Sequence, residues 1–145
     1  FKGTWLIRVL LAAGAHVTGY ALSPATQSLF DATDTKKYIN SIESDIRDKD
    51  ALIQAVTKAW PDIVFHLAAQ PLVRLSYRQP VETYSTNVMG TVNILEAVRQ
   101  CASVRSFVNI TTDKVYEKNG VGDIGRTKIF AALIRIQIVR AAANW

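Results

Sequence analysis

An unbroken apolar run after Pro61 constrains the fold more than any other stretch of this chain. Residues 63–67 are all apolar or aromatic, without the alternation of a strand that has one wet face. Such a run is typical of a central strand in a parallel sheet that is covered on both faces. The run ends in Ala68 and Ala69, whose small side chains leave the main chain open. Because open α/β sheets bind ligands at the carboxyl ends of their strands, the stretch predicts a ligand site there.

Helices and strands alternate on both sides of this central strand. Helical spacing of apolar residues predicts helices over residues 4–13, 50–60, 81–101 and 127–143, and extended patterns predict strands over 15–22, 38–44 and 106–110. Residues 23–37 are polar and predict a surface loop with a short helical turn around 28–31. Asp48 is expected to cap the helix that follows it. The order predicts an α/β fold with a doubly wound, Rossmann-like parallel sheet.

The long helix predicted over residues 81–101 has an apolar stripe. We expect its buried face to consist of Val88, Val92, Leu95 and Val98. Cys101 lies at its end and cannot form an internal disulfide, because it is the one cysteine in the chain. On an apolar helix, a buried structural thiol is favoured over a reactive one.

The first predicted helix begins directly after Gly3, with no strand before it. In a doubly wound sheet such a helix follows a strand and a glycine-rich turn. We therefore expect the first strand, and the earlier glycines of the turn, to be missing from the sequence.

The composition is that of an ordinary globular domain. A chain of 145 residues with 49% hydrophobic and 20% charged residues can bury a core and is not expected to be disordered. No apolar run reaches the roughly 18–20 residues that cross a bilayer, and no export signal is recognised, so we expect a cytoplasmic protein without membrane partners. The net charge of +5 comes from scattered Lys and Arg residues, which makes nucleic-acid binding the weaker interpretation.

A second polar cluster, residues 111–114, follows the strand predicted over 106–110. Carboxyl ends of parallel strands meet at one edge of a sheet, so we expect this cluster to lie near residues 67–70. Hydroxyl, carboxylate and amine groups together can transfer protons. The alternative is that Thr112 and Asp113 only cap the turn after the strand.

A series of motifs within residues 1–118 resembles the CDP-glucose 4,6-dehydratase group of the extended short-chain dehydrogenase/reductase family. The motifs are FKGTW at 1–5, AHVTGYAL at 15–22, DIRD at 45–48, VFHLAAQPLVR at 64–74, YSTNVMGT at 84–91 and TTDKVY at 111–116. The resemblance implies NAD as cofactor, a nucleotide sugar, with CDP-glucose preferred, as substrate, and no metal. It also implies a homodimer that pairs through the helix of residues 81–101 and the helix after Lys128.

The resemblance assigns the cofactor site residue by residue. Gly3 matches the last glycine of the family's Gly-x-x-Gly-x-x-Gly turn, beside the pyrophosphate, and Phe1 belongs to the same turn. Asp45 and Ile46 match the residues that meet the adenine. The remaining cofactor residues are Leu67, Ala68 and Ala69, beside the ribose and pyrophosphate, together with Thr111 and Lys128. No acid occurs in residues 20–23, where an acid would favour NAD over NADP.

The resemblance also implies catalytic roles. The family's reaction removes hydride from sugar C4, eliminates water across C5 and C6, and returns hydride to C6. Thr112 would hydrogen-bond the reacting hydroxyl, Asp113 would protonate the departing C6 hydroxyl, and Lys114 would assist at C5. Gln70 and Arg74 would face the substrate, and a solvated Arg74 is equally compatible with the pattern.

Two further residues lie close to this site in the sequence. Asn87 matches a helix asparagine of the family that supports the active site. His66 lies inside the apolar strand and is predicted to be a core histidine rather than a catalyst.

One catalytic element of the family has no match. The hydride step uses Tyr-x-x-x-Lys, in which the tyrosine is the base and the lysine lowers its pKa. Residues 124–133 resemble this helix with Ile124 in place of the tyrosine and with Lys128 at the lysine position. The loop before this helix is also shorter than in the family.

Residues 1–145 are therefore interpreted as an incomplete NAD-binding Rossmann-like domain, with the substrate domain largely absent. Whether the chain is an enzyme stays open. One hypothesis is a fragment of a nucleotide-sugar 4,6-dehydratase that converts CDP-glucose to CDP-4-keto-6-deoxyglucose. The other is a non-catalytic nucleotide-binding or dimerisation module of the same fold.

Overall fold

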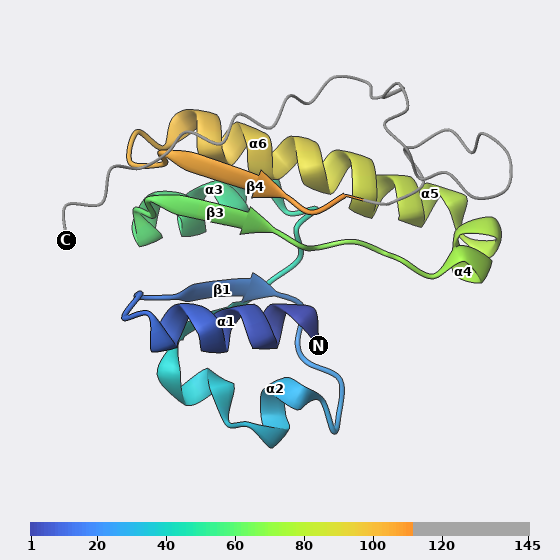
Figure 1. Ribbon diagram of the computed structural model, residues 1–145. Helices are drawn as coiled ribbons and strands as arrows, with labels where there is room; N and C mark the ends of the chain where they lie inside the picture. The colour runs from blue at the N-terminus through green and yellow to red at the C-terminus, as the bar shows by residue number, and fades with distance from the viewer. Residues whose placement is uncertain (112–145) are drawn as a thin grey trace, which may run out of the picture.

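The computed structural model describes residues 1–111 (Figure 1). The elements in chain order are α1 (Lys2–Ala12), β1 (Thr18–Ala21), α2 (Leu29–Ala32), the 3-10 helix η1 (Thr35–Tyr38), β2 (Asn40–Glu43), α3 (Lys49–Ala59), β3 (Ile63–His66), α4 (Val73–Arg78), α5 (Pro80–Tyr84), the π-helical turn η2 (Ser85–Met89), α6 (Gly90–Gln100) and β4 (Ser106–Asn109). The helix expected over residues 127–143 lies outside the described residues. Among residues 1–111, no helix combines the length and apolarity needed to span a membrane.

The strands are parallel, as the sequence predicts. β1 pairs with β2, with Thr18 opposite Asn40, and β3 pairs with β4, with Ile63 opposite Ser106. Within residues 1–111 these pairs form two two-stranded sheets rather than one continuous sheet. In the strand order 3-2-1-4-5-6 of doubly wound folds, the first strand separates the second from the fourth. The β1–β2 pair therefore corresponds to the second and third strands of that order, and the β3–β4 pair to the fourth and fifth. This correspondence agrees with the predicted fold.

Helix α3 forms where its local signals predict it. The Asp48 carboxylate accepts a hydrogen bond from the Ala51 amide at 3.0 Å, which satisfies one of the free N–H groups of the first turn. The helix ends at Ala59, and the next residue, Trp60, has a left-handed φ of 48° immediately before Pro61. The loop expected over residues 23–37 contains α2, which Ser28 caps, and the start of η1.

The core of the described residues lies between α3 and α6. Its buried apolar side chains are Leu52 and Val56 from α3, Ile94 and Ala97 from α6, and the adjoining Cys101. The predicted burial of Cys101 is thus confirmed.

The predicted buried face of the long helix was wrong, because Leu95 and Val98 are only partly buried. Val88 and Val92 are about half exposed, whereas Gly90 and Asn93 are buried. The reason is that α6 presents its small and amide side chains to the turn after β2. Helical structure nevertheless runs from Pro80 to Gln100, through the π-helical turn, as expected. Helix α4 is an additional element that the sequence pattern did not predict.

Candidate nucleotide-binding site

The carboxyl ends of the strands point to the same side of the molecule as the start of α1. Figure 1 shows the arrowheads of β1, β3 and β4 directed toward the side on which the N-terminus lies. The loops that follow β2, β3 and β4 contain most of the described residues that the sequence assigns to a cofactor. This edge is therefore the candidate site.

The first turn of α1 contains Gly3, which has no side chain. A Cβ added to Gly3 would meet no atom within 4 Å. Because the first N–H groups of a helix lack intrahelical partners and carry partial positive charge, this turn fits a pyrophosphate group.

The loop after β3 exposes two alanines and is held by an asparagine. Ala68 and Ala69 are exposed, and Leu67 is half-buried. The Gln70 amide N–H donates to Asn87 Oδ1 at 2.7 Å, and Asn87 Nδ2 donates to the Gln70 carbonyl at 3.1 Å. Asn87 therefore fixes the backbone where the exposed alanines end, from within the π-helical turn.

Gln70 and Arg74, which are both expected to face the substrate, lie in different surroundings. The Gln70 side chain donates to the Leu72 carbonyl and to Thr83 Oγ1, and it accepts from the Leu72 amide at 2.5 Å. Its amide is therefore engaged within the protein. Arg74 is exposed on α4, where its guanidinium can reach a ligand or water.

His66 is a buried histidine, 5% exposed, and so the predicted core role is confirmed. Its Nε2 lies 3.0 Å from Thr91 Oγ1, and that hydroxyl donates to the Asn87 carbonyl at 2.7 Å. Since the hydroxyl has one proton, His66 Nε2 carries the hydrogen and donates it. Burial lowers the pKa of His66. The neutral ring therefore links β3 to the helix turn that contains Asn87.

The turn after β2 holds a carboxylate in a fixed orientation. The Asp45 carboxylate accepts from the Arg47 amide at 2.9 Å, and both of its oxygens accept from the Arg47 guanidinium. Hydrogen bonding to Arg47 lowers the pKa of Asp45, so this side chain is ionised at neutral pH. Arg47 also contacts Glu82 on α5. Tyr20 donates to the Asp45 carbonyl at 3.0 Å.

The same turn is docked on α6. Asn93 Nδ2 donates to the carbonyls of Ile46 and Arg47, at 3.0 and 3.2 Å. A Cβ on Gly90 would lie 2.7 Å from Ile46 Cγ2, so only glycine allows Ile46 to pack this closely. The sequence reasoning did not identify Arg47, Gly90 or Asn93 as residues that position Asp45 and Ile46.

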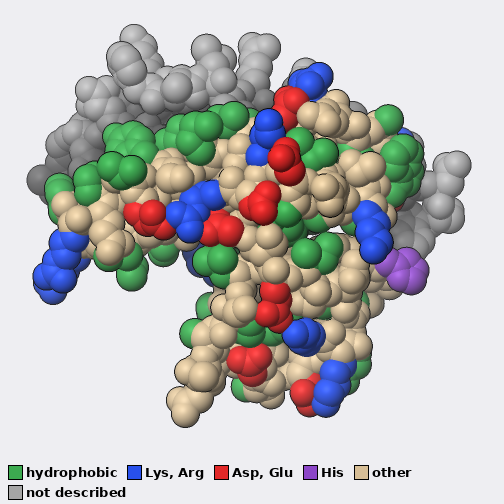
Figure 2. Space-filling view, turned by 180° about the vertical axis from the view of Figure 1, so that it is seen from behind, with side chains coloured by type: hydrophobic (Ala, Val, Ile, Leu, Met, Phe, Trp, Pro, Cys, Tyr) green, Lys and Arg blue, Asp and Glu red, His purple; other side chains and the backbone are tan. Residues whose placement is uncertain are grey.

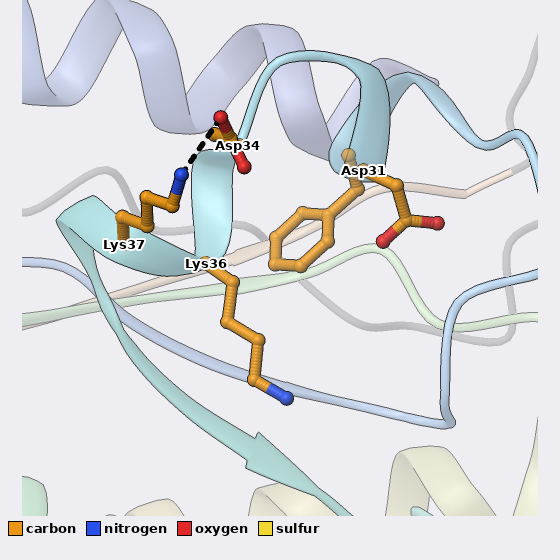
Figure 3. Close-up of a pocket in the computed structure, with 5 residues that line it drawn as sticks. Asp31, Asp34, Lys36 and Lys37 are labelled. Atoms are coloured by element: carbon orange, nitrogen blue, oxygen red, sulfur yellow. Dashed lines mark ion pairs between the residues drawn. The ribbon is translucent and has the colours of Figure 1, made fainter.

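A hollow lies on the opposite side of the β1–β2 pair from α6. Phe30, Asp31, Asp34, Lys36 and Lys37 line it (Figure 3). Lys36 forms an ion pair with Glu43 at the end of β2. The sequence reasoning also missed Glu43, although its place at the end of a predicted strand was a possible signal.

One of the residues expected after β4 lies within the described part of the chain. Thr111 is exposed just after β4, and the Ile110 amide beside it donates to the His66 carbonyl at 3.0 Å, which keeps the ends of β3 and β4 together. The expected catalytic residues Thr112, Asp113, Lys114 and Lys128 lie outside the described residues.

Comparison with known proteins agrees with a dinucleotide-binding fold. The sequence model of the GDP-mannose 4,6 dehydratase family matches residues 1–130. The chain is 52% identical over 118 residues to a CDP-glucose 4,6-dehydratase of Salmonella typhimurium, which covers 81% of this chain and 33% of that protein. The chain thus spans about one third of the length of this relative.

Solved structures with the same fold contain bound NAD. The UDP-glucose 4-epimerase from Brucella ovis in complex with NAD superposes with a TM-score of 0.70 at 25% identity, covering 83% of this chain and 35% of that one. The UDP-glucose 4-epimerase of Thermus thermophilus in complex with NAD gives a TM-score of 0.62 at 31% identity, covering 71% and 32%.

Proposed function

The chain belongs to the GDP-mannose 4,6 dehydratase family, and on that premise we propose that it is the NAD-binding part of a nucleotide-sugar 4,6-dehydratase. CDP-glucose is the proposed substrate, because a relative with 52% identity is a CDP-glucose 4,6-dehydratase. Loss of water would give CDP-4-keto-6-deoxyglucose, which makes the whole protein a lyase. Residues 1–145 are assigned to the NAD-binding domain.

The identity of 52% with a CDP-glucose 4,6-dehydratase, over 81% of this chain, is the observation that carries the proposal. Gly3, in the first turn of α1, has no side chain, so a pyrophosphate can approach the free N–H groups of this turn closely. Phe1 belongs to the same turn. NAD, when bound, supplies the hydride acceptor and donor of the reaction.

The loops at the strand ends are assigned to the rest of NAD. The ionised Asp45 can accept a hydrogen bond from the adenine amino group, and Ile46 offers an apolar contact. Leu67, Ala68 and Ala69 are assigned to the ribose and pyrophosphate, because their exposure leaves the main chain accessible. Thr111 and Lys128 complete the proposed cofactor set.

The reacting sugar is assigned to residues near the end of β4 and beyond it. Thr112 hydrogen-bonds the C4 hydroxyl, Asp113 protonates the departing C6 hydroxyl, and Lys114 assists at C5. Arg74 and Gln70 are assigned to the substrate side, where the exposed Arg74 guanidinium can bind a phosphate. A cytoplasmic location stays a prediction.

A homodimer is part of the proposal. The helical stretch from α5 to α6 exposes Val81, Tyr84, Val88 and Val92, which recur at helical spacing. In Figure 2 hydrophobic side chains gather on the side of the molecule where α4 and α5 lie, whereas acidic and basic side chains are interspersed over the rest of that face. An exposed apolar face of this kind suits a second copy of the same helix.

Incubation of the full-length protein with CDP-glucose and NAD tests the proposal. The expected result is a product that is lighter by one water, detected by mass spectrometry, and that carries a C4 ketone. NAD binding, measured by titration calorimetry without any product, would instead support a non-catalytic nucleotide-binding module. The second outcome has a specific basis, since Ile124 replaces the tyrosine of the family's Tyr-x-x-x-Lys.

A further inference from the structure

Glu43, the last residue of β2, connects three elements at the carboxyl edge of the β1–β2 pair. It lies opposite Ala21 in the parallel register. Its Oε2 accepts a hydrogen bond from Ser23 Oγ at 2.7 Å, and its Oε1 lies 2.7 Å from Lys36 Nζ. Its side chain keeps 38% of its surface exposed, so a ligand can reach the carboxylate.

The end of β1 is the corner at which dinucleotide-binding folds distinguish NAD from NADP. About 20 residues after the glycine turn, a carboxylate bonds the 2′-hydroxyl of the adenosine ribose in NAD-binding proteins, and a cation accommodates the 2′-phosphate in NADP-binding ones. Residues 20–23 fill this position and contain no acid. Glu43 comes from the neighbouring strand, but its hydrogen bond to Ser23 places its carboxylate at the same corner.

The charges around the end of β1 disfavour the 2′-phosphate of NADP. Lys36 forms an ion pair with Glu43, and this pair offsets the charge of Lys36. Hydrogen bonding to Lys36 lowers the pKa of Glu43, so the carboxylate is ionised at neutral pH. Lys37 pairs separately with Asp34 at 2.9 Å. Figure 3 shows the Lys36 side chain extending away from that second pair.

We propose that Glu43 selects NAD over NADP in this protein. Its carboxylate accepts a hydrogen bond from the 2′-hydroxyl of the adenosine ribose, and its charge repels a 2′-phosphate. It also holds Lys36 in an ion pair, so that this ammonium group is not free to bind a phosphate. The inference rests on the proposed function, because it requires that the site bind a dinucleotide.

The Glu43→Gln variant of the full-length protein tests this role. Glutamine keeps the length of the side chain and a hydrogen-bonding oxygen, but it removes the negative charge and releases Lys36. We expect NADP affinity to rise on the order of tenfold, because a like charge is removed and a cation is freed. NAD affinity should fall about tenfold, because a charge-assisted hydrogen bond is weakened. Titration calorimetry with each dinucleotide gives both dissociation constants without reference to catalysis.

Two further variants identify the cause. Asp34→Asn releases Lys37 from a more exposed ion pair, on the rim of the hollow that Lys36 also lines, and it should leave the ratio of the two affinities unchanged. Adding Lys36→Met to Glu43→Gln should reduce the gain in NADP affinity to the part that comes from removing the like charge, because the freed ammonium group is then absent.

The possible outcomes separate this inference from the proposed function. A wild-type protein that binds NAD, with the same NAD to NADP ratio in Glu43→Gln, would overturn the role of Glu43 alone and make the Glu43–Lys36 contact an ordinary surface ion pair. A wild-type protein that binds neither dinucleotide would overturn both proposals. An equal change of ratio in Asp34→Asn would also count against Glu43, since it would show a general effect of surface charge.

Discussion

The side-chain amide of Asn93 donates a hydrogen bond of 3.0 Å to the backbone carbonyl of Ile46, 47 residues earlier in the chain. The same nitrogen donates to the carbonyl of Arg47 at 3.2 Å. Asn93 is 7% exposed, so water replaces neither contact readily. This one amide therefore ties the turn that contains Asp45, an expected adenine contact, to the core helix α6.

Replacing Asn93 with leucine should destabilise the protein by about 1–3 kcal/mol, because two backbone carbonyls lose their buried donor. Chemical denaturation monitored by circular dichroism measures the change. Arg99→Gln is a suitable control, since the Arg99–Glu96 pair on the outer face of α6 is exposed and should change stability by less than about 1 kcal/mol. Equal losses in the two variants would show that the Asn93 contacts contribute little.

Alanine at Gly90 and alanine at Gly3 should have opposite effects. At Gly90 the new methyl group would lie 2.7 Å from Ile46 Cγ2, so the Ile46 side chain must shift, and we expect a loss of about 1–3 kcal/mol. At Gly3 the methyl group meets no atom of residues 1–111 within 4 Å beyond its own helical turn, and alanine in a helix is favoured over glycine by about 0.5–1 kcal/mol. Thermal unfolding of the two variants should therefore shift in opposite directions.

Gly3→Ala has a second expected result in NAD binding. The added methyl group would occupy the space in which the proposed pyrophosphate approaches the main chain, so NAD affinity should fall at least about tenfold while stability is kept. Titration with NAD measures this. A variant that binds NAD as tightly as the parent would show that the pyrophosphate does not lie at the first turn of α1.

The local parts of this fold could be predicted from the sequence, and the contacts between distant segments could not. Helix α3 is predictable because Asp48 caps it and Pro61 follows its end, and both signals lie beside the helix itself. The burial of Asn93 depends on two carbonyls that precede it by 46 and 47 residues. A prediction from apolar residues alone places a polar residue such as Asn93 on the surface of the helix. For the same reason it places the neighbouring Val92 in the core, although Val92 is about half exposed.

In the candidate site, too, local features could be predicted from the sequence and contacts between distant segments could not. Small residues after an apolar strand were enough to identify the loop at Ala68 and Ala69 as an open edge. Glu43 was missed because an acid was sought at the end of β1 itself. Its effect depends on the register of β2 against β1, which places it opposite Ala21, and a single strand's sequence does not contain that register.

Asn87→Asp tests whether the loop after β3 must be held for NAD to bind. The aspartate keeps the acceptor for the Gln70 amide but replaces the donor with a second oxygen, which faces the Gln70 carbonyl. We expect NAD affinity to fall about three- to tenfold, because the loop with Ala68 and Ala69 loses one of its two anchors. Ser76→Ala, on exposed α4, is the control and should bind NAD as the parent does. Unchanged affinity in Asn87→Asp would contradict a positioning role for Asn87.

The neutral state of His66 predicts a loss of stability in mild acid. Burial lowers the pKa of His66 below its ordinary value of 6.5, so the unfolded chain binds a proton that the folded protein resists. Stability is therefore full above about pH 6.5 and decreases as the pH falls toward the folded-state pKa of His66. In His66→Gln, whose amide can still donate to Thr91, the decrease between pH 7 and pH 5 should be smaller. His16→Gln, at an exposed site, is the matched control and should keep the decrease of the parent. Denaturation midpoints across this range measure the effect, and parallel curves for the parent and His66→Gln would show that His66 is not its source.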